Sequence, residues 1–67
     1  MEKGIIKEMF DNENGIIIDE KKQEYYFSKV NCDSEDIKID DKVLFDFIII
    51  ETQNEYPIYK AINIEKI

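Results

Sequence analysis

The sequence has no histidine, no tryptophan and no arginine, and it contains one cysteine, one proline and two glycines. A single cysteine excludes a disulfide within the chain, and the lack of histidine excludes a four-ligand Cys/His zinc site. Cys32 lies in the polar stretch N-C-D-S, and no histidine can activate it as a nucleophile. We interpret it as an incidental thiol, and we expect neither a metal nor a cofactor.

Long apolar runs are also missing. No segment is long enough for a signal peptide or a membrane span, so we expect a cytoplasmic protein that does not enter a membrane. The 67 residues predict a single domain, 1–67, with little room for a deep catalytic pocket. No pairing of carboxylates with a second catalytic group is evident in the sequence, and we predict that the protein is not an enzyme.

Positive charge is scarce. Nine lysines stand against sixteen acidic residues, which gives a net charge of −7. Most of the negative charge falls in residues 31–56, whereas residues 57–67 are slightly basic. Nucleic-acid binders usually carry the opposite overall sign, so this chain would need a local lysine patch to attract phosphates.

Apolar and β-branched residues occur in short runs that are separated by polar turns. This pattern predicts strands at residues 3–10, 16–18, 23–30, 43–51 and 58–67. The expected turns are residues 11–14 and 20–22, with a longer loop at 31–36, which can hold one helical turn at 34–36, and another loop at 52–56. Five short strands with one long connection predict an all-β fold, a small five-stranded antiparallel OB-like barrel, because closure removes exposed edges.

The scaffold resembles the cold-shock domain family, whose fold is a five-stranded OB-type barrel. The family patterns G-x-V-K-W-F, K-G-F-G-F-I and V-F-V-H-F correspond to G-I-I-K-E-M at 4–9, E-N-G-I-I-I at 13–18 and Y-F-S-K-V at 26–30. After a shorter loop, L-x-x-G-x-x-V-x-F-x-V corresponds to residues 37–47, and Q-A-x-N-V to residues 60–64. The positions that this alignment directs inward are all apolar, namely Ile6, Ile16, Ile18, Val43, Phe45, Phe47, Ala61 and Ile64.

The resemblance implies that bases stack on aromatic residues of the first three strands. At those family positions this chain has Glu8, Gly15, Ile17 and Lys29, and Phe27 alone is aromatic. A register shifted by one around Gly15 would replace Gly15 and Ile17 with Ile16 and Ile18. The nucleic-acid-binding residues predicted on this basis are Lys7, Ile17, Tyr25, Phe27, Lys29 and Lys60.

Each of these residues also has an ordinary structural interpretation. Phe27 and Tyr25 are either exposed contact residues or part of the core, and Ile17 is either an apolar contact or a packing residue. The three lysines either contact phosphates or are simply solvated, as charged residues on strand faces usually are.

Two hypotheses for the function follow. In the first, which the resemblance implies, the protein binds single-stranded RNA or DNA weakly and with little sequence preference, as an RNA chaperone does. In the second, the barrel has lost nucleic-acid binding and acts as a protein-interaction or dimerisation module, through the Ile17 surface and the apolar run 48–50.

Overall fold

The computed structural model describes residues 1–53 and 56–67 and contains five strands. The elements are β1 (Glu2–Met9), β2 (Asn14–Asp19), β3 (Glu24–Ser28), the 3-10 turn η1 (Lys29–Asn31), β4 (Lys42–Ile50) and β5 (Ile58–Lys66). All five predicted strands are therefore confirmed, with ends that differ by at most two residues. Within the described ranges no helix is long and apolar enough to cross a membrane.

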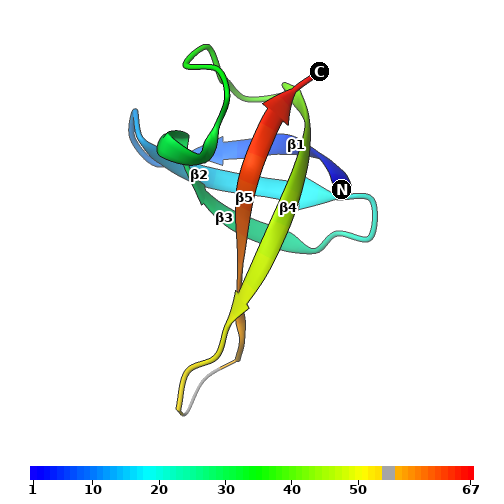
Figure 1. Cartoon of the computed structure of the whole chain (residues 1–67), viewed down its shortest axis with the longest axis vertical. Coiled ribbons are helices and arrows are strands. Elements are labelled where there is room, and N and C mark those ends of the chain that lie inside the picture. Colours follow the sequence, from blue (N-terminus) through cyan, green and yellow to red (C-terminus); the bar gives the residue numbers. More distant parts are fainter. Residues whose placement is uncertain (54–55) are drawn as a thin grey trace.

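The strands close into a barrel in the order β1-β2-β3-β5-β4 (Figure 1). Four neighbouring pairs are antiparallel, as predicted, but β3 and β5 are parallel. The reason is topological, because a closed ring with an odd number of strands cannot alternate direction at every step. The prediction of an OB-like barrel is confirmed, and its strictly antiparallel pairing is wrong at this one place.

Aspartate side chains shape the two short turns. The Asp11 carboxylate accepts hydrogen bonds from the backbone N–H groups of Glu13 and Asn14, at 2.7 and 2.8 Å. Asp19 accepts from the N–H groups of Lys21 and Gln23 in the next turn, both at 2.9 Å. These are the side-chain-to-backbone bonds for which aspartate is favoured in turns, so both predicted turns are confirmed.

The helical turn predicted at residues 34–36 is wrong. The one helical turn among the described residues is η1, which follows β3 directly, and the Ser28 side chain accepts a bond from Val30 N–H at its start. A serine at this position satisfies a backbone donor that the turn leaves free. The loop predicted at 52–56 includes residues 54–55, which lie outside the described residues.

The core fills the barrel interior. Its members share a side-chain exposure of at most 5 % and come from all five strands and the connection before β4: Ile6, Ile17, Tyr25, Phe27, Ile37, Val43, Phe45, Ala61 and Ile64. Five of the eight positions predicted to face inward are confirmed, whereas Phe47 is 36 % exposed and lies outside the core. Ile16 and Ile18 instead lie on the outer face of β2, since their neighbour Ile17 is the one in the core cluster.

A bulge in β1 changes which residues reach the outer face. Ile6 lies opposite Ile17 and Glu8 lies opposite Ile16, so Lys7 is an extra residue in β1. Because of this insertion, Lys7 and Glu8 are both exposed, and inward packing resumes at Met9. A bulge of this kind bends the strand and redirects side chains.

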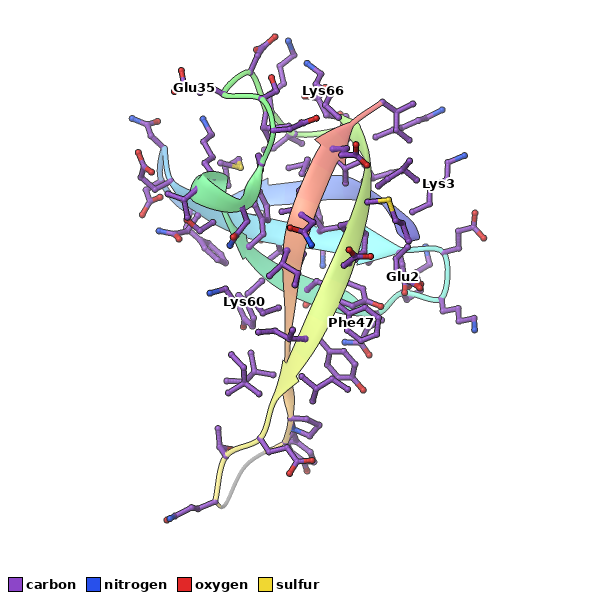
Figure 2. The ribbon with its side chains drawn as sticks, in the orientation of Figure 1. Glu2, Lys3, Glu35, Phe47, Lys60 and Lys66 are labelled. Carbon is purple, nitrogen blue, oxygen red and sulfur yellow. The ribbon has the colours of Figure 1, made fainter. Side chains whose placement is uncertain are left out.

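Strands β4 and β5 continue past the barrel wall as a two-stranded ribbon, which forms the long projection in Figure 1. The projection contributes to a longest molecular dimension of 35 Å, against 24 and 17 Å in the other directions. In the ribbon Ile49 lies opposite Tyr59 and Ile50 lies opposite Ile58. Figure 2 shows Phe47 and Lys60 on opposite sides of it, as the alternation of side chains along paired strands requires.

Candidate nucleic-acid interface

Three of the predicted contact residues are buried. The exposed fractions of Ile17, Tyr25 and Phe27 are 0 %, 4 % and 3 %. Ile17 lies opposite Tyr25, and Phe27 lies opposite Gly15, all directed into the barrel. The prediction that these three residues form a binding face is therefore wrong. Their alternative interpretation as core residues is confirmed for all three.

Gly15 shows why Phe27 fits inside. A Cβ atom at Gly15 would approach the Phe27 ring to 2.8 Å and would also collide with the backbone carbonyl of Glu8. The absence of a side chain at this position lets β1 and the Phe27 ring come together over β2. Gly15 thus serves the packing of the barrel and leaves no space for a ligand.

Tyr25 combines core packing with one polar contact at the barrel end. Its ring packs against Phe45 with a centroid separation of 4.9 Å, and its hydroxyl donates a hydrogen bond to Asp19 at 2.9 Å. Burial, together with this bond to a carboxylate, raises the pKa of Tyr25 well above its usual range. Partial burial of Asp19 acts to raise its pKa, but the bonds from Gln23, Tyr25 and Lys21 outweigh it, and the pKa is lowered.

Phe10 and Tyr26 are two exposed aromatic residues that pack against each other, and the sequence analysis did not select them. Each is 52 % exposed, and their ring centroids are 6.4 Å apart with a 36° tilt. Ile16 lies opposite Tyr26 on β2 and is 8 % exposed although it belongs to the outer face. We call Phe10, Ile16 and Tyr26 the outer aromatic patch.

A signal for this patch was present in the shifted register around Gly15, which directs Ile16 and Ile18 outward. Alternation along β3 then directs Tyr26 outward as well. The run Tyr25-Tyr26-Phe27 is aromatic at every position, so hydrophobicity alone does not choose between its two faces.

The three predicted lysines have different surroundings. Lys60 lies opposite Tyr26 across the parallel β3–β5 pairing and is half-buried beside the patch. Lys7 is exposed and forms an ion pair with Glu24, whose hydrogen bond and charge raise the lysine pKa. Lys29 follows β3 in η1 and lines an open depression with Ile37 and Lys38 at the barrel end. The structure brings Lys60 to the patch and does not bring Lys29 there.

A second feature of the outer face lies where β1, β2 and β4 adjoin. A groove of about 360 Å³ is lined by three lysines, two isoleucines, two acidic residues and one glycine: Lys3, Gly4, Ile5, Ile18, Asp19, Glu20, Lys22 and Lys42. We call this the lysine groove. Ile18 in the groove and Ile16 in the outer aromatic patch are next but one to each other on β2, so both features belong to one continuous sheet face.

Comparison of the chain with models of known protein families, with curated proteins and with solved structures found no match.

Proposed function

We propose that the protein binds single-stranded RNA or DNA weakly through the outer aromatic patch. The observation that carries this proposal is the exposed pair formed by Phe10, directly after β1, and Tyr26 on the outer face of β3, with Lys60 of β5 opposite Tyr26. OB-type barrels bind oligonucleotides on the face of these strands, and the sequence resemblance to cold-shock domains supports the same role. A free thiol at Cys32 is compatible with the reducing cytoplasm, where we place this activity.

Two aromatic platforms set the scale of the affinity. Stacking contributes about 1–3 kcal/mol per base, so two rings supply about 2–6 kcal/mol. Stacking alone therefore corresponds to dissociation constants between about 40 μM and about 30 mM. Every base has a π-face, so stacking alone gives little sequence preference.

Lys7 has a smaller part in this proposal than Lys60. A phosphate that contacts Lys7 must displace Glu24, and Glu8 stands exposed on the same strand. Lys60 has no ion-pair partner within the ranges 1–53 and 56–67. We therefore assign the phosphate contact beside the stacked bases to Lys60.

The test is a titration with short oligo-dT and oligo-U at low salt, followed by amide chemical shifts. Tyr26→Ala is expected to weaken binding about 5- to 160-fold, which corresponds to the loss of one stacking platform of about 1–3 kcal/mol. Tyr56→Ala is the matched control, because Tyr56 is 88 % exposed and lies in the connection between β4 and β5. Equal binding by wild type and Tyr26→Ala, or shift changes that leave out Tyr26 and Lys60, would refute the proposal.

A second candidate function is self-association through the β4–β5 ribbon, with a second copy of this chain as the occupant. The ribbon exposes large apolar side chains on both of its sides, at 36–50 % each: Phe47, Ile48, Ile49, Ile50 and Ile58. Among the described residues, 46–50 of β4 pair with β5 alone, which leaves the other edge of this segment open. Two-fold antiparallel pairing of these edges would satisfy both open edges and cover apolar surface from both copies.

Sedimentation velocity over a wide concentration range tests this second candidate. We expect a dimer that Ile49→Lys abolishes, since the substitution places a charge in the middle of the apolar surface. Ile39→Lys is the control, because Ile39 is 51 % exposed but lies outside the ribbon. A wild-type protein that stays monomeric up to about 1 mM would rule the dimer out, because its association would then be weaker than about 4 kcal/mol.

A further inference from the structure

The lysine groove concentrates positive charge on an acidic protein. Lys3 and Ile5 come from β1, Lys42 lies opposite Ile5 on β4, and Lys22 comes from the turn after β2. Figure 2 shows Lys3 near the start of β1, directed away from the barrel. Three ammonium groups thus border a depression whose apolar residues are Ile5 and Ile18.

The three lysines of the groove outnumber its two acidic residues. None of the three forms an ion pair within the described part of the chain, although the protein has sixteen acidic residues. Asp19 also lines the groove, but its carboxylate already accepts bonds from Tyr25, Lys21 and Gln23. Glu20 is the other acid among the lining residues, so three lysines against two carboxylates leave an excess of one positive charge.

The backbone at Lys22 adds an independent feature. Its φ angle is 71°, in the left-handed region that glycine adopts readily and other residues adopt at a cost. Asp19 maintains the turn around it through its bonds to the backbone on both sides. The lysine side chain therefore occupies a position where the backbone alone would favour glycine.

We propose that the lysine groove binds the phosphodiester backbone of the strand whose bases stack on the outer aromatic patch. This inference rests on the proposed function and specifies the path of the strand, from Tyr26 along β2 toward the turn after it. Ile16 and Ile18 are about 7 Å apart along β2, which is the length of two stacked nucleotides at about 3.4 Å each. A strand of three or four nucleotides thus reaches both features.

The salt dependence of binding measures how many phosphate contacts the groove makes. Each phosphate contact to a single strand contributes about −0.7 to the slope of log K against log salt concentration. Three groove lysines give a slope of about −2 from the groove alone, and removal of one lysine lowers its magnitude by about 0.7. At 50 mM salt one such contact corresponds to about an 8-fold change in affinity.

The test uses Lys22→Gly in the full chain, with Lys21→Gly as the matched control. Both remove one positive charge from the same turn, but Lys21 does not line the groove. Glycine suits the φ angle at position 22, so this variant is expected to melt at the wild-type temperature or above it. Oligo-dT binding, measured by fluorescence anisotropy at several salt concentrations, should weaken about 8-fold at 50 mM salt and lose about 0.7 of slope in Lys22→Gly. Binding by Lys21→Gly should keep the wild-type slope.

The outcomes separate the two proposals. One outcome refutes this inference alone. In it the wild type binds oligo-dT, Tyr26→Ala weakens that binding, and Lys22→Gly keeps the full slope of log K against log salt concentration. The groove would then not contact the bound strand. If the wild type binds no oligonucleotide, both proposals fail. Equal effects of the two glycine variants indicate diffuse charge attraction and also overturn the inference. Competition with tripolyphosphate is the final experiment, and we expect this polyanion to displace oligo-dT from the wild type. Tripolyphosphate that binds in the groove without displacing oligo-dT would contradict the inference that the oligonucleotide backbone binds there.

Discussion

Replacement of two adjacent aromatic residues in β3 tests the assignment of inner and outer faces. Phe27 is 3 % exposed inside the barrel, whereas Tyr26 is 52 % exposed on its surface. Truncation of a buried phenylalanine to alanine costs about 3–5 kcal/mol. A chain of 67 residues has a total stability of about 3–10 kcal/mol. Phe27→Ala therefore removes a large part of the stability and leaves a fraction of the molecules unfolded in buffer.

Tyr26→Ala should have a much smaller effect on the fold. About half of its side chain is already in contact with water, so the lost burial is worth about 1 kcal/mol. Urea unfolding followed by circular dichroism measures both variants. With a slope of about 1 kcal/mol per molar urea, the midpoint should fall by about 1 M for Tyr26→Ala and by about 3 M or more for Phe27→Ala.

The two variants should also differ in binding, since Tyr26→Ala remains folded but loses affinity for oligo-dT. Comparable destabilisation by the two substitutions would refute the assignment of faces. So would a stable Phe27→Ala protein that has lost binding, because this combination requires Phe27 outside and Tyr26 inside.

The remaining predictions concern the core and the turns. Tyr25→Phe should lower the free energy of unfolding by about 1–2 kcal/mol in urea titrations, because it removes the hydroxyl bond to Asp19 and leaves the ring packing intact; an unchanged midpoint would contradict this. Gly15→Ala should destabilise the barrel by about 1–3 kcal/mol or more, because the added carbon would lie 2.8 Å from a core ring; a thermal melt equal to wild type would show that the space exists. The pKa values of Asp11, Asp19 and Asp41 are lowered in the folded protein, so their contribution to stability is present above the ordinary value of 3.8 and is lost as the pH falls through the folded values. Unfolding free energies measured between pH ~5 and pH ~2 should therefore decrease steadily below pH ~4, and a flat profile would be inconsistent with these turn bonds.

The positions of the strands and turns along the chain could be predicted because each has a local cause. Short apolar runs are interrupted by turn residues, and Asp11 and Asp19 stand where the turns need a side-chain acceptor. In β4, Val43 and Phe45 alternate with less buried residues and correctly indicate the inner face. The residues of a strand alone are sufficient to predict its inner face where one side of the strand is apolar and the other is not.

The binding face could not be predicted in the same way. Ile16-Ile17-Ile18 and Tyr25-Tyr26-Phe27 are apolar at every position, so either alternate set of residues could fill the core. The bulge at Lys7 shifts the pairing register of β1 against β2 by one further residue, and no local sequence pattern indicates it. Only the pairing of β1, β2 and β3 decides these faces, and that pairing depends on residues far apart in the chain. The lysine groove was missed for the same reason, since its lysines come from two strands and a turn.

The parallel β3–β5 pairing also has a consequence for the protein during its synthesis. A chain leaves the ribosome from its N-terminus, so β1 to β4 are complete before residues 58–66 are available to close the ring. Until then β3 and β4 each present an unpaired edge, and the apolar end of β4 has no opposite strand. Such edges are sites of aggregation. Pairing of β5 with β3 and β4 therefore removes the edges that are prone to aggregation. A nascent chain that stops before β5 should be a far better target for chaperones and proteases than one that stops after it.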